Sequence, residues 1–191
     1  KSCARRDGDR AILAHTAPID ALFTATLVNE WAWTRAASDG AARAVAQEVP
    51  AEERLPATLP EAVEHLRALL AAESNPTLLA LAERASRERV PCLADEDLVT
   101  VGYGHKGESW PVRALPDPDA VAWTARAAIP VALVTGSNGK TTTVRLVAAM
   151  LADAGHTVGF SCSDGVFIAG ERIVEGDWSG PAGARRVLRD P

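Results

Sequence analysis

Residues 131–143 read VALVTGSNGKTTT, and this stretch decides the fold of the chain. An apolar run at 131–134 leads into a short turn that contains two glycines. Apolar residues then recur three and four positions apart from Val144 to Leu151, which is the spacing of a helix. The segment is therefore predicted to form a strand, a tight loop and a helix. Such a loop directs backbone N–H groups and the positive end of the helix dipole toward one point, where phosphate binds.

Each residue type in this loop suits phosphate binding. Gly136 and Gly139 can take positive φ and let a phosphate approach the backbone. Lys140 can reach the β- and γ-phosphates of a nucleotide, and Thr141 places a hydroxyl where it can bind Mg²⁺. Val134 stands where the usual pattern G-x-x-x-x-G-K-[ST] has its first glycine, so only a shorter form is present. The alternative is a glycine-rich turn with an exposed lysine, but the order of strand, loop, Lys-Thr and helix favours a phosphate loop.

The sequence TGSNGKTT at 135–142 resembles the phosphate loop of the Mur ligase superfamily, which includes folylpolyglutamate and cyanophycin synthetases. In that superfamily the short form of the loop is the norm. The later segments 163–174, 176–181, 184–185 and 187–191 resemble the cyanophycin synthetase-like branch. The resemblance covers 129–191 and implies an α/β fold whose parallel-sheet P-loop unit corresponds to the start of a Mur ligase central domain. Because much of that domain would follow residue 191, we expect a truncated unit in a fragment of a longer protein.

This resemblance implies an ATP-dependent ligase that joins a carboxylate to an amine through an acyl phosphate. Its cofactors would be ATP and Mg²⁺, and its substrates a small-molecule or peptide carboxylate and an amine. Lys140 would be the catalytic residue that screens the γ-phosphate, and Thr141 would be the metal ligand. We expect the fragment itself to be inactive. The nucleotide would be bound by Thr135, Gly136, Ser137, Asn138, Gly139, Lys140, Thr141 and Thr142.

A second candidate group follows the next predicted strand, at 157–161. A strand-helix-strand unit of this length predicts a right-handed parallel crossover. Ser161, Ser163 and Asp164 lie at the carboxyl end of that strand, the edge that faces the ligand in open α/β sheets. These residues either bind substrate or Mg²⁺-coordinated water, or only cap a turn.

Turn residues divide the rest of the C-terminal part. Gly165, Ala169 and Gly170 separate two apolar pieces, so 164–174 is predicted to form a hairpin. Gly155 is expected just after the end of the preceding helix. Ser179 or Gly180 is expected to cap a last helix, whose start would be another place for an anion.

Residues 1–115 are predicted to form a smaller mixed α/β or α+β domain, joined by a proline-rich linker at 116–128 to the unit at 129–191. Within it, residues 1–10 are expected to be a solvated end or a strand edge, and 49–60 a loop. The predicted strands are 11–14 and 98–101, and the predicted helices are 18–37, 60–70 and 76–89.

The segment 102–107 reads GYGHKG and formally matches the dinucleotide-binding pattern G-x-G-x-x-G. That pattern requires a helix to begin at the loop, and Pro111, Pro116 and Pro118 forbid a regular one. A hairpin or a surface loop is predicted here instead.

The composition argues against some functions and indicates the state of the cysteines. The net charge is −5, so the overall field does not favour nucleic acid, and no apolar run approaches the ~18 residues of a membrane span. Cys3, Cys92 and Cys162 lack the spacing of a metal site and indicate free thiols in the cytoplasm. Two other functions remain open: a P-loop kinase or NTP hydrolase, and a non-catalytic nucleotide-binding module.

Overall fold

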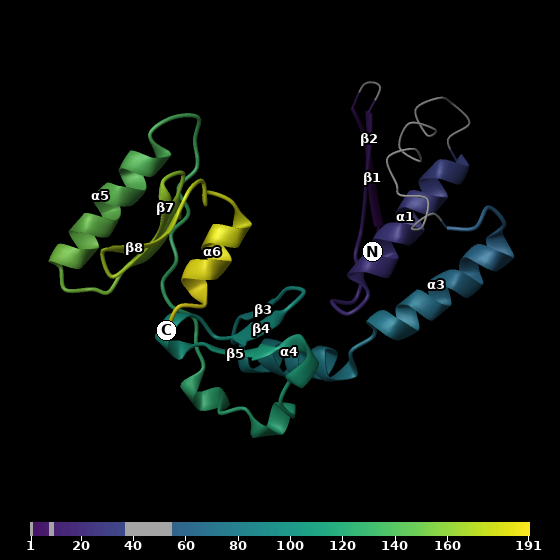
Figure 1. Cartoon of the computed structure of the whole chain (residues 1–191), viewed down its shortest axis with the longest axis horizontal. Helices are drawn as coiled ribbons and strands as arrows, with labels where there is room; N and C mark the ends of the chain where they lie inside the picture. Colours follow the sequence, from purple (N-terminus) through teal and green to yellow (C-terminus); the bar gives the residue numbers. More distant parts are fainter. Residues whose placement is uncertain (1, 8–9, 37–54) are drawn as a thin grey trace. The chain divides into compact units, whose positions relative to one another are not determined.

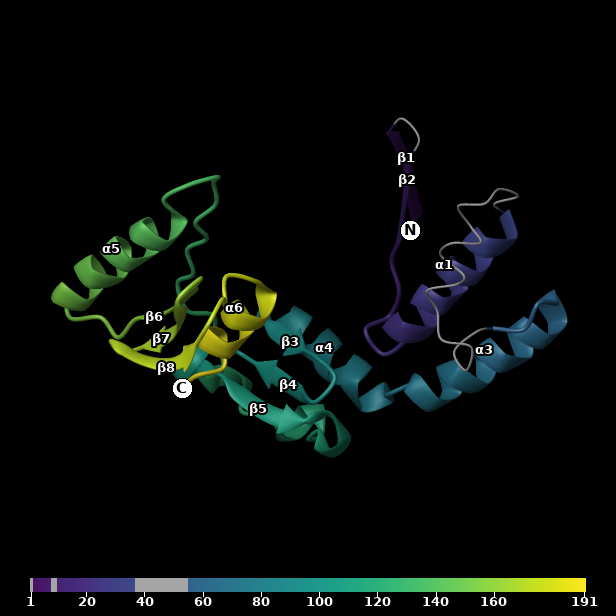
Figure 2. The ribbon, with the colours of Figure 1, turned by 45° about the horizontal axis from the view of Figure 1, so that its top comes forward.

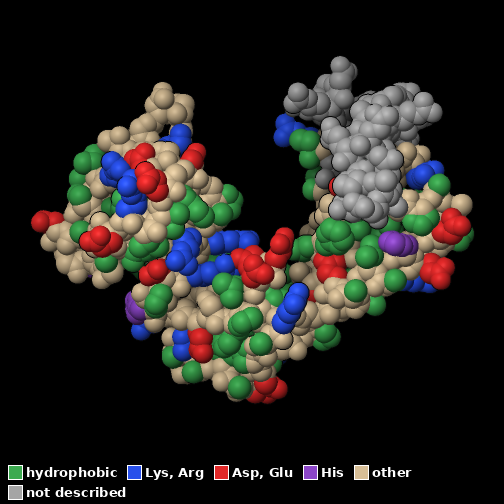
Figure 3. Space-filling model, in the orientation of Figure 1, with side chains coloured by type: hydrophobic (Ala, Val, Ile, Leu, Met, Phe, Trp, Pro, Cys, Tyr) green, Lys and Arg blue, Asp and Glu red, His purple; other side chains and the backbone are tan. Residues whose placement is uncertain are grey.

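The computed structural model describes residues 2–7, 10–36 and 55–191, which divide into two compact units, 1–79 and 80–191 (Figure 1). Both units combine helices with antiparallel strands, so the chain is mixed α/β in composition. Among the described helices, none is long and apolar enough to cross a membrane. Figure 3 shows both acidic and basic side chains on the visible face of the described residues.

The first unit holds a two-stranded ribbon and helices. Strands β1 (Ser2–Asp7) and β2 (Arg10–His15) pair antiparallel, so residues 1–10 contain a strand edge. The predicted helices are confirmed as α1 (Leu22–Ala36), α3 (Leu59–Glu73) and α4 (Pro76–Glu88), the last of which continues into the second unit. The predicted end of the first helix at 37, and residues 49–54 of the predicted loop, lie outside the described residues.

In the first unit, two carboxylates accept hydrogen bonds from backbone N–H groups at or just before the starts of two helices, α1 and α4. Glu73, at the end of α3, accepts hydrogen bonds from the N–H groups of Phe23 (2.7 Å) and Thr24 (2.8 Å) in the first turn of α1. Asp20, just before α1, accepts one from the N–H of Asn75 (2.9 Å), ahead of α4. Burial raises the pKa of Glu73, but the hydrogen bonds from Thr24 and Phe23 bring it below its ordinary value.

The second unit begins with a small antiparallel sheet of β3 (Cys92–Ala94), β4 (Leu98–Val101) and β5 (Glu108–Pro111), in that order. Its centre is β4, in which Val99 and Val101 are fully buried. Between β4 and β5 lies a single 3₁₀ turn at Gly104–Lys106. The predicted hairpin at 102–107 is confirmed, and β5 follows where a dinucleotide fingerprint requires a helix.

Residues 112–128, expected to include a linker, are held against this sheet. They contain three 3₁₀ turns, Val112–Ala114, Pro118–Ala120 and Trp123–Ala125, and they bury Trp123, whose indole N–H donates to the carbonyl of Pro118 at 2.7 Å. Arg126 pairs with Glu108 of β5 at 3.0 Å. Residues 112–128 therefore lie within the second compact unit, 80–191. The boundary of the family domain near 116–128 stays a prediction.

The C-terminal part contains the second small sheet and two helices that flank it. Helix α5 (Lys140–Asp153) packs against β6 (Gly159–Cys162), while α6 (Pro181–Leu188) packs against β6 and β7 (Gly165–Ile168). Figure 2 shows both helices beside the strands. The helix predicted after the loop is confirmed, as is Gly180 as the cap of α6.

Two local motifs explain why these elements end where they do. Gly155 takes a φ of +85°, and the N–H groups of Gly155 and His156 donate to Ala152 and Leu151 in a Schellman pattern that ends α5. Strand β7 turns into β8 (Glu171–Glu175) through Ala169 and Gly170, which both have positive φ. This is the two-residue turn that suits a twisted hairpin, so the hairpin prediction is confirmed.

The expected parallel arrangement is not what the structure contains. Residues 131–134 are not a strand, and the side chain of Leu133 is 88% exposed. Strand β6 pairs antiparallel with β7, and every strand pair among the described residues is antiparallel. An isolated extended segment cannot form a ladder, because its backbone N–H and C=O groups need a neighbouring strand. Residues 131–134 have no such neighbour in the described part of the chain.

Candidate nucleotide site

The loop before α5 has the backbone that its sequence predicts. Gly136 and Gly139 take φ values of +143° and +77°, and Gly139 is the residue that precedes the first turn of α5. A Cβ built at Gly139 would meet nothing within 4 Å, so glycine is needed there for its conformation and not for space. The first N–H groups of α5 lack acceptors within the helix and point out of its start. This geometry suits an anion.

Lys140 lies over the loop that precedes it. Its ammonium donates to the carbonyl oxygen of Gly136 at 2.7 Å and to that of Ser137 at 3.4 Å. The side chain is exposed, so the ammonium can exchange these carbonyls for phosphate oxygens without any core rearrangement. The positive charge therefore lies beside the backbone that would surround a phosphate.

The structure brings the second candidate group to the loop. The hydroxyl oxygens of Thr141 and Ser163 are 3.0 Å apart, which joins the start of α5 to the turn between β6 and β7. Ser161 instead lies beside α6: a Cβ built at Gly183 of that helix would be 2.9 Å from the Cβ of Ser161. Of the three residues predicted at the end of this strand, Ser163 and Asp164 are thus on the loop side and Ser161 is beside α6.

Arg145 lies beside the candidate site, and the sequence analysis did not predict it there. It lies one turn after Thr141 on α5, and its guanidinium forms an ion pair with Asp164 at 2.8 Å. The guanidinium also lies over the ring of Phe167, 5.7 Å from its centroid, and that ring stacks on Phe160. The spacing of four residues from Thr141 was the available signal, because such residues share a helix face.

The start of α6, the other predicted anion position, already has a carboxylate beside it. The hydroxyl and the N–H of Ser179 donate to Asp177 at 2.7 Å and 3.0 Å. The hydrogen bond from the Ser179 hydroxyl, with that from its N–H, lowers the pKa of Asp177 below its ordinary value. The ionised carboxylate repels a second anion, so the start of α5 is the better phosphate position.

Among the described residues, no group of three or more histidine, cysteine or acidic side chains could hold a metal ion. The oxygen donors at the loop are instead the hydroxyls of Thr141 and Ser163. Hard oxygen donors are the ligands that Mg²⁺ accepts, usually together with phosphate oxygens and water. The residues present therefore fit Mg²⁺ bound with a nucleotide, and they do not fit a metal held by the protein alone.

Comparison with known proteins identifies the same region. The family model for the Mur ligase middle domain matches residues 134–171. Cyanophycin synthetases are similar over a third of this chain: that of Crocosphaera subtropica is 48% identical over 64 residues, and that of Synechocystis is 46% identical over 63. The cyanophycin synthetase of Geminocystis herdmanii is 44% identical over 63 residues. Each match spans 7% of the relative's length. No solved structure matches.

Proposed function

Because residues 134–171 match the family model for the Mur ligase middle domain, we propose that this chain supplies the phosphate loop of an ATP-dependent ligase. The proposed reaction joins a carboxylate to an amine. The observation that carries the proposal is the loop itself, with Gly139 in the left-handed conformation and the Lys140 ammonium 2.7 Å from the carbonyl oxygen of Gly136. Because the similar proteins are cyanophycin synthetases, cyanophycin is the first product to assay.

In the proposed reaction, the carboxylate oxygen attacks the γ-phosphorus, and the bond from that phosphorus to the ADP oxygen breaks. The amine then attacks the acyl carbon and forms a C–N bond. The bond from the acyl carbon to the phosphate oxygen breaks, inorganic phosphate leaves, and the amine loses a proton to the phosphate or to solvent. The backbone N–H groups of 136–142 would hold the phosphates, and Lys140 would move from the loop carbonyls to the γ-phosphate. The hydroxyls of Thr141 and Ser163 would hold Mg²⁺, which neutralises phosphate charge when it is bound. Transfer of this kind depends mainly on positioning and on charge.

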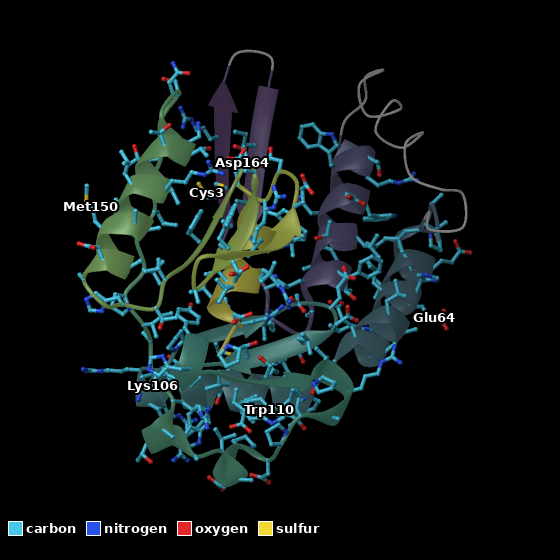
Figure 4. All side chains as sticks on the ribbon, turned by 60° about the vertical axis from the view of Figure 1, so that its left-hand side comes forward. Cys3, Glu64, Lys106, Trp110, Met150 and Asp164 are labelled. Carbon is cyan, nitrogen blue, oxygen red and sulfur yellow. The ribbon has the colours of Figure 1, made fainter. Side chains whose placement is uncertain are left out.

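The proposal also accounts for the exposed apolar surface of the C-terminal part. Leu133 and Val131 are 88% and 55% exposed, and on α5 Met150 is 67% exposed. Figure 4 shows Met150 projecting from α5 away from the strands. We propose that 131–134 becomes a strand when further parallel strands lie beside it, in a longer protein that contains this chain. The carboxylate and amine sites would lie in that longer protein, so the 191 residues alone are expected to bind nucleotide without turning over.

One observation disfavours a P-loop kinase or NTP hydrolase, the alternative left open by the sequence. Such an enzyme needs a free acidic side chain after the neighbouring strand to hold the metal. Asp164 is the nearby candidate, and its carboxylate is paired with Arg145 at 2.8 Å. We therefore favour the ligase. Its use of ATP and its free thiols, Cys3, Cys92 and Cys162, support a cytoplasmic location for it.

The test uses the complete protein that contains this chain. ADP release is measured with ATP and Mg²⁺, with and without candidate carboxylate and amine substrates, and the formation of cyanophycin is assayed. Lys140→Ala should abolish turnover while the fold is retained, and Lys106→Ala, an exposed lysine in the β4–β5 turn, should not. Near-normal ATP-dependent activity in Lys140→Ala would show that the assignment is wrong. ADP release that needs no acceptor would support the hydrolase instead.

A further inference from the structure

We propose that Arg145 is a positioning residue: through Asp164 it holds the turn that carries Ser163, and thereby sets the Ser163 hydroxyl against that of Thr141. This inference rests on the proposed function and adds to it a residue that touches neither the nucleotide nor the metal. Arg145 would determine how tightly Mg²⁺ is bound with the nucleotide. Its effect on the nucleotide alone would be small.

The geometry that carries this inference is a pair of contacts from one face of α5 to one short turn. Thr141 reaches Ser163 at 3.0 Å, and Arg145, one helical turn later, reaches Asp164 at 2.8 Å. The turn consists of just these two residues, because Cys162 and Gly165 are the last paired residues of β6 and β7. Both residues of the turn are thus fixed from α5 (Figure 4 labels Asp164).

Arg145 is itself held at two points, which makes it a suitable support. Its guanidinium lies over the ring of Phe167 as well as beside Asp164. Phe167 stacks on Phe160 at 4.6 Å, so the aromatic support belongs to β6 and β7. A planar guanidinium can stack and pair at the same time, whereas an ammonium holds the carboxylate as a point charge. Lysine at 145 should therefore keep only part of the effect.

The ion pair is too exposed to act mainly through stability. The side chains of Arg145 and Asp164 are 52% and 44% exposed, and ion pairs of that exposure contribute little to the stability of a fold. Their position matters more, because outer partners that orient metal ligands typically change metal affinity by about 10–100-fold. Removing Arg145 would also leave the Asp164 carboxylate unpaired near the phosphates. The two consequences, lost orientation and added repulsion, can be separated by a double variant.

The experiment measures dissociation constants for ADP on the full chain, once with Mg²⁺ and once with EDTA, by isothermal titration. Arg145→Gln should weaken binding with Mg²⁺ by about tenfold or more, should change binding in EDTA far less, and should leave the melting temperature nearly unchanged. Arg145→Lys should recover part of the loss. If orientation dominates, Arg145→Gln combined with Asp164→Asn should stay as weak as Arg145→Gln; if repulsion dominates, it should recover. Recovery to wild-type affinity would overturn a positioning role.

The control is Arg87→Gln, which removes another exposed ion pair, with Glu83 on α4, and should leave both constants unchanged. Equal losses with Mg²⁺ and with EDTA, or no loss in Arg145→Gln, would overturn the inference while leaving the phosphate loop intact. Failure of the proposed function gives a different result, since the wild-type chain would then bind no ADP, or Lys140→Ala would bind it normally. That result would overturn the inference as well.

Discussion

Arg189 should be among the residues on which the stability of the second unit depends most. It follows α6, and its side chain is only 14% exposed. Its guanidinium donates to the carboxylate of Asp95, to the hydroxyl of Thr100 at 2.9 Å and to the carbonyl of Leu98 at 3.2 Å. These three partners belong to the β3–β4 hairpin, so one side chain joins the end of α6 to the first sheet of the unit. The test substitution is Arg189→Met, which keeps the length of the side chain and removes the donors.

The size of the loss follows from the burial of the partners. Removing one partner of a fully buried ion pair costs about 3–5 kcal/mol. Asp95 is 28% exposed and can regain some water, whereas Thr100 is 1% exposed but keeps the hydroxyl of Ser109 at 2.9 Å. We therefore expect a loss of about 2–3 kcal/mol, below the fully buried case and above a surface pair. With an m-value of about 2 kcal/mol/M, the urea midpoint should fall by about 1 M.

The assay is urea unfolding with hydrogen exchange read out on β3–β5 and α6. Arg186→Met, at an exposed position on α6, is the matched control and should change the midpoint little. Burial raises the pKa of Asp95, but the hydrogen bonds from Arg189 and Leu98 lower it overall. The pair therefore stabilises the fold above the unfolded pKa of about 3.9 and loses that effect as pH falls through the folded value. Arg189→Met with a midpoint equal to that of Arg186→Met would refute this reasoning.

Three further predictions concern other parts of the chain. Glu73→Gln should destabilise the first unit by about 1 kcal/mol, as loss of a helix cap does. It should also make the first unit less sensitive to acid, because the lowered pKa of Glu73 stabilises the folded state at pH values above the unfolded pKa and this effect is lost as the pH falls. Melting curves between pH 3 and 7 that match those of wild type would contradict this. Gly183→Ala would place a Cβ 1.9 Å from the carbonyl oxygen of Trp178 and should cost about 1–3 kcal/mol in urea unfolding. Gly180→Ala meets nothing within 4 Å, so equal losses would refute the steric argument. The 102–107 loop should not bind a dinucleotide, and micromolar NAD affinity that is lost in Gly104→Val would overturn that expectation.

The sequence was sufficient wherever the signal is local. The φ requirement of Gly139, the end of α5 at Gly155 and the turn at Ala169-Gly170 each depend on a few neighbouring residues, and all three were predicted. The absence of a regular helix after 102–107 was also predicted for a local reason, since Pro111 excludes it. The residues that favour a turn likewise act only on the few positions of that turn.

The failures concern pairings between distant residues. Whether 131–134 forms a strand depends on neighbours that its own sequence does not specify, and in the structure the segment is exposed. The pairing of Asp95 with Arg189 joins residues 94 positions apart, and neither has a local pattern that indicates the other. Arg145 differs, because its spacing from Thr141 was visible and only its partner was not.

The most direct test of the central claim is a titration of the 191-residue chain with Mg²⁺ and ADP, read out by calorimetry and by the melting temperature. Nucleotide that binds only the folded state adds about 2.7 kcal/mol of stability at a concentration 100 times the dissociation constant. We predict binding and stabilisation in wild type and in Lys106→Ala, and loss of both in Lys140→Ala. A folded wild-type chain that shows neither at millimolar ADP, or a Lys140→Ala variant that keeps both, would contradict the assignment of the phosphate loop.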